Sequence, residues 1–152
     1  MHSVILKQSG IVNVEFSENV TVVQPVNLYG CKIGKNTFIG PFTEVQKDVI
    51  IGEDCKIQSH SFICELVTIG NSCFIGHGVV FINDLFSYGK PAGGNKELWK
   101  STIIGNNVSI GSNVTILPIT ICDNVVIGAG SVVTKDIIKE GVYVGNPAKK
   151  IK

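Results

Sequence analysis

The strongest constraint on the fold of this chain is a six-residue repeat of large apolar side chains. Between residues 33 and 81 every sixth position carries one: Ile33, Ile39, Val45, Ile51, Ile57, Ile63, Ile69, Ile75 and Phe81. The spacing extends upstream through Phe16, Val22 and Leu28, and it resumes at Ile104, Ile110, Ile116, Ile121, Ile127 and Val133. A period of six fits neither an α-helix nor a long strand, but it is typical of short strands joined by turns in a parallel β-helix.

Each hexad offers a second inward position, four residues after the large one. It carries a small or β-branched residue at Thr37, Thr43, Val49, Cys55, Ser61, Val67, Cys73, Val79, Val108, Val114, Thr120, Val125 and Ser131. The hexads that begin at Leu28 and Ile116 are one residue short. Three hexads make a triangular coil of about 18 residues, so we predict an all-β prism of about six coils, roughly 29 Å long.

Turn residues support this prediction. The position three residues after the large one carries types that tolerate a left-handed backbone, at Asn36, Asp48, Asp54, Gly78, Asp84, Asn107, Asn113, Asn124 and Gly130. Isoleucine and valine number 21 and 20 against 6 leucines and 3 alanines, which favours strands over helices.

Charge and cysteine content exclude several classes of protein. Thirteen lysines, no arginine and twelve carboxylates give a net charge of +1, so nucleic acid is not an expected partner. The sequence shows neither a long apolar run nor a secretory signal, so we expect no membrane partner and a cytoplasmic location. Five cysteines without a C-x-x-C pair argue against a disulfide framework and a zinc ribbon.

The repeat also predicts the domain organisation. We expect one domain over residues 1–152, with coils at 16–137 and caps at 1–15 and 138–152 that cover the exposed strand edges. The hexads stop at residues 85–103, a stretch that contains Pro91, Gly93 and Gly94, so we predict a protruding loop with a functional role there.

Residues 18 apart should lie above one another, and the loop should let Ile104 resume above Ile69. One corner then carries stacked small residues in three adjacent columns: Gly76, Gly111 and Gly128; His77, Ser112 and Ala129; Gly78, Asn113 and Gly130. Such a strip exposes backbone amides over about 10 Å. The glycines could equally be ordinary turn residues. The same counting places His77 above Ser59, and Asn83 above Glu65, which lies above Lys47.

Several stretches carry a family resemblance: VNLYGCKIG, IQSHSFICE, FIGHGVVFIND, NVSIGSNVTILP, ICDNVVIGAGSVVTKDI and VGNPAK. They resemble the hexapeptide-repeat acyltransferases, and within them the N-acetyltransferases of nucleotide-linked amino sugars. The joined motifs SHSFICE and GHGVVFIND look closest to enzymes that acetylate the 3-amino group of dTDP-3-amino-3,6-dideoxyhexoses, sugars of surface polysaccharides such as lipopolysaccharide. The left hand of the β-helix is implied by this resemblance and does not follow from the period.

The resemblance implies acetyl-CoA as cosubstrate, no metal, and a homotrimer that binds the sugar nucleotide between chains. For the CoA we expect these contacts: Gly76, Gly111, Ser112 and Ala129 along the strip, and Lys135, Pro147 and Lys149 near the adenine end. Asn83 is expected to position the amine, with His77 or Asp84 as proton relay, and backbone amides at residues 76–78 to bind the oxyanion. Substrate contacts are expected from His60, Glu65, Tyr88 and Trp99.

Other interpretations remain open. Each histidine and lysine could be an ordinary surface residue, Glu65 with Lys47 a surface ion pair, and Trp99 a packing anchor. An O-acetyltransferase on a small alcohol would depend on a histidine base. A zinc hydrase would need three histidines, and the chain has only His2, His60 and His77. A scaffold would call for a flat, regular outer face. The residues distinguish neither dTDP from UDP, nor gluco from galacto sugars, nor a 3-amino from a 4-amino group.

Overall fold

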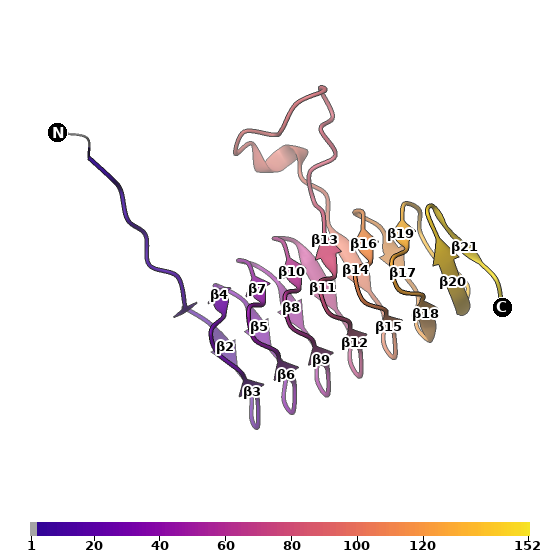
Figure 1. Cartoon of the computed structure of the whole chain (residues 1–152), viewed down its shortest axis with the longest axis horizontal. Helices are drawn as coiled ribbons and strands as arrows, with labels where there is room; N and C mark the ends of the chain where they lie inside the picture. Colours follow the sequence, from indigo (N-terminus) through magenta and orange to yellow (C-terminus); the bar gives the residue numbers. More distant parts are fainter. Residues whose placement is uncertain (1–2) are drawn as a thin grey trace.

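The computed structural model describes residues 3–152, which wind into a parallel β-helix with three sheets as its sides (Figure 1). Sheet A contains β1 (Ile11–Val12), β4 (Asn27–Tyr29), β7 (Glu44–Val45), β10 (Phe62–Ile63), β13 (Val80–Phe81), β16 (Thr115–Ile116) and β19 (Val132–Val133). Sheet B contains β2 (Glu15–Phe16), β5 (Lys32–Ile33), β8 (Ile50–Ile51), β11 (Val67–Ile69), β14 (Thr102–Ile104) and β17 (Thr120–Ile121). Sheet C contains β3 (Thr21–Val22), β6 (Phe38–Ile39), β9 (Lys56–Ile57), β12 (Phe74–Ile75), β15 (Ser109–Ile110), β18 (Val125–Ile127), β20 (Gly141–Gly145) and β21 (Ala148–Lys150).

The chain visits the sheets in the order A, B, C, so the predicted all-β triangular prism is confirmed. Six coils are complete. A seventh consists of β19, a single bridge from Ile137 to Ile121, and β20. The predicted register is also confirmed, because Ile69 pairs with Ile104 across the interruption, and Ile110 lies between Ile75 and Ile127.

The repeat supplies the core. Every large hexad residue from Leu28 to Val133 is at most 1% exposed, whereas Phe16 at the open end of the prism is 41% exposed. The two short hexads differ from the prediction, because Cys31 and Ile119 point inward and Lys32 and Thr120 are exposed. In a hexad that is one residue short, the small inward position comes three residues after the large side chain. It is therefore filled by the residue before the one that counting indicates.

Polar groups at the small inward positions donate hydrogen bonds to carbonyls of the next coil. Thr37 Oγ1 donates to Gly52 O at 2.9 Å, Ser61 Oγ to Gly76 O at 3.0 Å, and Cys55 Sγ to Gly70 O at 3.1 Å. These bonds compensate the desolvation of the buried groups. Thr102 Oγ1 is the one buried side-chain polar atom within residues 3–152 that has no partner.

The corners follow the prediction at eight of the nine turn positions. A positive φ is found at Asn36, Asp48, Asp54, Gly78, Asn107, Asn113, Asn124 and Gly130. Asp84 is the exception, since the chain leaves the prism there and the left-handed residue is Phe86. Three bulkier residues also adopt left-handed angles, Phe42, His60 and Leu66.

The predicted loop is present between β13 and β14, where it stands off the prism and contains the short 3-10 helix η1 (Lys96–Leu98) (Figure 1). It ends before Thr102, earlier than the predicted boundary at 103, because Thr102 is buried in β14. Coil pairing begins at Ile11, inside the segment expected as a cap, and residues 3–9 extend away from the prism (Figure 1).

The C-terminal segment completes sheet C. Strand β20 pairs with β18, and β21 folds back on β20 as the antiparallel last strand. Within residues 3–152, none of the helical structure has the length and apolarity needed to cross a bilayer.

Candidate functional site

Two corners flank the outer face of sheet A, and the expected site residues divide between them. The corner between sheets C and A carries Gly76, Gly111, Gly128 and the residues beside them, called here the glycine strip. The corner between sheets A and B carries the loop and a cavity of about 470 Å³, called here the loop pocket. The loop pocket is lined by Tyr29, Gln46, Phe62, Cys64, Glu65, Val80, Phe81, Ile82, Asn83, Asp84, Phe86 and Trp99.

Coil contact explains the glycines of the strip. A Cβ at Gly76 would lie 2.7 Å from the Gly111 carbonyl carbon, and one at Gly111 would lie 2.5 Å from Ala129 N. Gly52 and Gly70 on the corner between sheets B and C meet the same restriction, so these glycines are required by packing alone. Packing therefore does not explain why the outer surface of the strip lacks bulky side chains. That surface is open because the neighbouring stacked positions carry only small residues, Ser112, Ala129 and Gly130.

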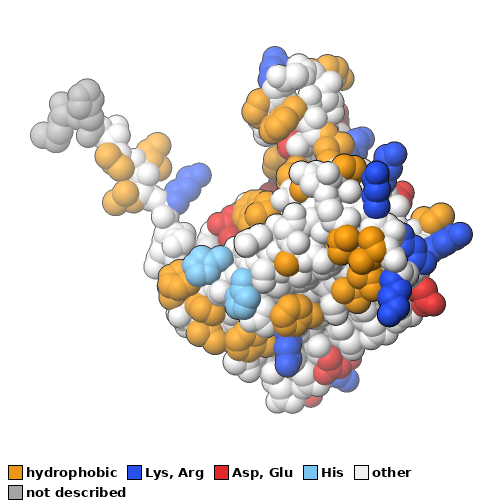
Figure 2. Space-filling model, turned by 45° about the vertical axis from the view of Figure 1, so that its right-hand side comes forward, with side chains coloured by type: hydrophobic (Ala, Val, Ile, Leu, Met, Phe, Trp, Pro, Cys, Tyr) orange, Lys and Arg blue, Asp and Glu red, His pale blue; other side chains and the backbone are white. Residues whose placement is uncertain are grey.

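Two histidines belong to the strip's lower coils. Ser59 Oγ lies 2.8 Å from His77 Nδ1, as the predicted stacking requires. With a proton on Nδ1, the Nε2 of His77 can act as an acceptor. His60 stacks on Phe42 with ring centroids 4.9 Å apart. Histidine side chains and apolar neighbours share the face seen in Figure 2.

The loop pocket brings together Asn83, Asp84, Glu65 and Trp99. Asn83 Nδ2 donates to Glu65 O at 3.2 Å, in agreement with the predicted column, and Lys100 N donates to Asn83 O at 2.9 Å. These bonds hold the asparagine at the point where the loop leaves the coil, and they leave its Oδ1 available as an acceptor.

Asp84 holds the base of the loop. Its two carboxylate oxygens accept from Phe86 N at 2.9 Å and from Ala92 N at 2.7 Å. The carboxylate therefore has a structural task in this conformation, beside the relay role predicted for it.

Glu65 lies above Lys47 in the stacked coils, as predicted, but its carboxylate forms an ion pair with Lys96 of η1. The alternative of an ion pair between Glu65 and Lys47 is therefore not found, and Lys47 Nζ lies 3.9 Å from Asp48 Oδ2. The Glu65 side chain is only 13% exposed, and the Lys96 ammonium also lies 5.3 Å from the centroid of Trp99. Burial, together with the charges of Glu44 and Glu65, raises the pKa of Tyr29 at the pocket wall.

The structure does not unite all the candidates. His60 and His77 lie at the glycine strip, across sheet A from Asn83, and Tyr88 is 75% exposed on the loop. Sequence reasoning missed Gln46 and Cys64, although both follow a large hexad residue and stack 18 residues apart below Ile82. Burial raises the pKa of Cys64 to about 12, so this thiol stays protonated and is no nucleophile at neutral pH.

Lys135, Pro147 and Lys149 do come together, around a cavity of about 130 Å³ that Thr134 and Ala148 complete. Lysines gather at this end of the prism, away from the N-terminal segment (Figure 2). Point charges of this kind can bind phosphate groups.

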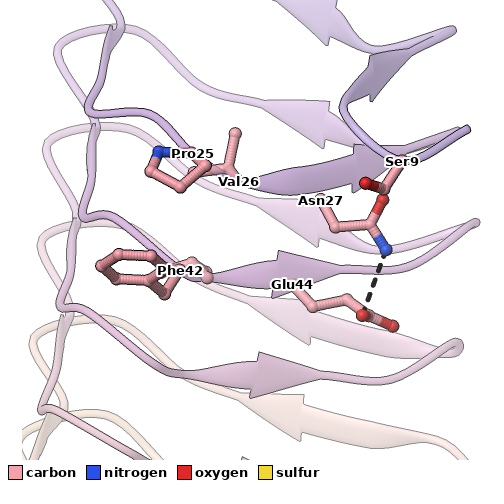
Figure 3. Close-up of a pocket in the computed structure, with 7 residues that line it drawn as sticks. Ser9, Pro25, Val26, Asn27, Phe42 and Glu44 are labelled. Carbon is pink, nitrogen blue, oxygen red and sulfur yellow. Dashed lines mark hydrogen bonds between the residues drawn. The ribbon is translucent and has the colours of Figure 1, made fainter.

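A further cavity of about 260 Å³ lies on the first coils, between Pro25, Phe42 and Glu44 (Figure 3). Asn27 Nδ2 donates to Glu44 Oε2 at 3.1 Å (Figure 3), and Glu44 Oε1 accepts from Gln46 at 2.9 Å. Gln46 also lines the loop pocket, so the hydrogen bond between Gln46 and Glu44 links the linings of the two cavities.

Metal ligation depends on clustered donors. Within the described part of the chain, residues 3–152, no three His, Cys, Asp or Glu side chains lie close enough together to hold an ion. His2, the third histidine of the zinc hydrase alternative, lies outside the described residues.

Two family models match the chain: bacterial transferase hexapeptide (six repeats) at residues 30–65, and hexapeptide repeat of succinyl-transferase at residues 101–135. These repeats imply a left-handed winding of the β-helix. A curated relative, the bifunctional protein GlmU of Streptococcus uberis, is 34% identical over 152 residues, which is 99% of this chain and 31% of the relative. The chain thus spans between about a fifth and a third of the length of the curated relatives it matches.

Solved structures share the fold. A mutant of AntD, an N-acyltransferase from Bacillus cereus, in complex with dTDP and coenzyme A superposes with a TM-score of 0.80 at 24% identity, over 92% of this chain and 83% of that chain. A maltose O-acetyltransferase from Clostridium difficile superposes with a TM-score of 0.56 at 30% identity, over 93% of this chain and 70% of that protein.

Proposed function

Because the chain belongs to the hexapeptide-repeat transferases, we propose that it is an acetyl-CoA-dependent N-acetyltransferase acting on the amino group of a nucleotide-linked amino sugar. The loop pocket carries this proposal, because it places the Asn83 amide beside a shielded carboxylate and an aromatic ring. AntD, with dTDP and coenzyme A bound, supports it by its similarity. We take dTDP-3-amino-3,6-dideoxyhexose, a precursor of surface polysaccharides, as the first substrate to test.

The reaction forms a C–N bond and breaks the C–S bond of the thioester, and the proton lost by nitrogen is taken up by the departing thiolate. An amine near its own pKa needs orientation more than a strong base. Asn83 Oδ1 accepts a hydrogen bond from the amine, and backbone amides of residues 76–78 stabilise the oxyanion. His77 or Asp84 relays the proton. Glu65, His60, Tyr88 and Trp99 contact the sugar nucleotide.

The CoA lies along the glycine strip, over Gly76, Gly111, Ser112 and Ala129, where bulk is absent. Its phosphates and adenine end reach the cavity of Lys135, Pro147 and Lys149. This placement uses the lysine-rich end of the prism for the charged part of the cosubstrate.

We infer that one site is built from the strip of one subunit and the loop pocket of another. His77 and Asn83 lie on opposite corners of sheet A, with Gly78 at one corner and strand β13 between them, and six residues of chain span at most about 20 Å. We propose a homotrimer in which the strip of one chain faces the loop pocket of the next, so that a thioester on the strip meets an amine held by the neighbouring chain. Light scattering tests this, and a monodisperse monomer with full activity rejects it.

Thiol release from acetyl-CoA, measured across dTDP-, UDP- and GDP-linked amino sugars, tests the activity. Asn83→Ala should lower kcat/KM by about 10²-fold for the best acceptor, and Thr68→Ala on the outer face of sheet B should leave it unchanged. A loss within threefold withdraws the role of Asn83. No thiol release with any acceptor withdraws the proposed reaction.

A second candidate is O-acetyl transfer to a small alcohol. The contact between Ser59 and His77 favours it, because a histidine oriented by a hydroxyl can serve as the base that an alcohol needs. The maltose O-acetyltransferase likeness points the same way. Here His77→Ala, and not Asn83→Ala, should abolish turnover.

A further inference from the structure

A carboxylate and an aromatic ring meet in the loop pocket, and a lysine of the chain itself occupies the place between them. Lys96 Nζ pairs with Glu65 Oε2 and lies 5.3 Å from the centroid of the Trp99 ring. A shielded carboxylate beside an aromatic face is the arrangement that binds a protonated amine, since both groups attract a cation.

The two partners of the ion pair are held very differently. Glu65 belongs to a coil, where its N–H donates to Gln46 Oε1 at 3.3 Å and its carbonyl accepts from Asn83. Its side chain is 13% exposed. Lys96 lies on a three-residue helix that buries none of its residues, and its side chain is 54% exposed. The carboxylate is therefore the fixed partner and the lysine the one that can leave.

We propose that Glu65 and Trp99 form a binding site for a primary ammonium group, and that Lys96 is an internal occupant which the acceptor amine displaces. That the ammonium belongs to an amino sugar rests on the proposed function, whereas the site itself rests on the contacts above. Lys96 thereby competes with the acceptor. A sugar hydroxyl carries no charge with which to displace it, so the site selects amines over alcohols.

Removal of the competing charge should strengthen amine binding. An ion pair whose lysine is exposed, together with a cation–π contact, corresponds to about a fivefold change in affinity. Lys96→Met keeps the length of the side chain and removes the ammonium. Lys90→Met is the matched control, because Lys90 lies on the same loop and is exposed.

Trp99 is the only tryptophan of the chain, so its fluorescence reports on this site alone. The probes are glucosamine and, as the neutral analogue, glucose. We expect glucosamine to bind Lys96→Met about fivefold more tightly than the parent or Lys90→Met, and glucose to give no saturable change. Adding Glu65→Gln to Lys96→Met should abolish glucosamine binding, with unchanged circular dichroism showing that the variant folds.

Equal glucosamine affinity in Lys96→Met and the parent overturns the inference, as does equal binding of glucose or binding that survives Glu65→Gln. Thiol-release assays of the same variants separate the two proposals. Expected fluorescence changes without acetyl transfer leave the amine site standing and reject the reaction. Acetyl transfer whose acceptor KM is the same in the parent and Lys96→Met rejects the inference and leaves the reaction standing.

Discussion

Replacing a buried threonine by valine should raise the free energy of unfolding at Thr102 and lower it at Thr37. Thr102 and Thr37 are both at most 1% exposed and occupy small inward positions of the prism. Thr102 Oγ1 has no partner within residues 3–152, whereas Thr37 Oγ1 donates to Gly52 O at 2.9 Å and accepts from Cys55 N at 3.1 Å. Valine has the same shape, with a methyl group in place of the hydroxyl.

At Thr102 the change removes a buried polar group that lost its water without gaining a bond, which should raise the free energy of unfolding by about 1 kcal/mol. At Thr37 it breaks two bonds and leaves the buried Cys55 N–H without its partner, which should lower that free energy by about 2 kcal/mol. Thr43→Val breaks one bond, from Oγ1 to Gln58 O at 3.2 Å, and should fall between the two.

Urea unfolding followed by circular dichroism measures the three free energies, and thermal unfolding gives an independent order. For a chain of this length, 1 kcal/mol corresponds to roughly 3 °C in Tm. We expect Tm to rise by about 3 °C for Thr102→Val and to fall by about 6 °C for Thr37→Val. A fall for both variants would refute the reasoning, because it would mean that the Thr102 hydroxyl is satisfied after all.

Three further predictions concern the strip, the loop and the buried thiols. Gly111→Ala brings a Cβ to 2.5 Å from Ala129 N and should cost about 2 kcal/mol and weaken CoA binding in calorimetry. At Gly130 a Cβ would meet open space, but the φ of +70° is unfavourable for alanine, so Gly130→Ala should lower the free energy of unfolding by about 1 kcal/mol. A larger loss of stability for Gly130→Ala than for Gly111→Ala would contradict the packing argument. Asp84→Ala frees the N–H groups of Phe86 and Ala92 and should speed limited proteolysis within residues 85–95 about tenfold, with Tm nearly unchanged. Burial raises the pKa of Cys31 to about 11 and that of Cys64 to about 12, from 9.0, so their contribution to stability is intact below pH 9 and is lost progressively as the pH rises from 9 toward 12. Urea midpoints that stay constant from pH 8 to 10.5 would contradict this.

The period of the sequence predicts the prism because one spacing determines strand, corner and core together. It fails where a coil is not 18 residues long. The hexad that starts at Leu28 is short, and the inward place goes to Cys31 although counting indicates Lys32. The first coil is likewise 17 residues long, with Ile11 paired to Leu28, and its first strand begins five residues before the predicted start of the coils at residue 16.

The site is less predictable than the fold, because its key contact does not follow the repeat. Column counting places Asn83 over Glu65 and His77 over Ser59, and both contacts are found. Counting also pairs Glu65 with Lys47, but Lys96 takes that carboxylate from a loop 31 residues away. The repeat does not determine where the loop contacts the prism, so the pairing of Lys96 with Glu65 can be identified only from the structure.

Backbone strain distinguishes the two corners beside sheet A from the third. At the corner between sheets B and C, the left-handed positions carry small polar residues, and Asn36 Nδ2 donates to Asp54 Oδ1 at 3.0 Å as part of a side-chain ladder. The corners beside sheet A place Phe42, His60 and Leu66 in the same left-handed conformation, at a cost of about 1–2 kcal/mol each. Asparagine or glycine would make these turns without strain, as the other coils show. The bulky side chains are therefore not there for the turn. Their place along the edges of sheet A argues, independently of any resemblance, that this face is the one the molecule uses.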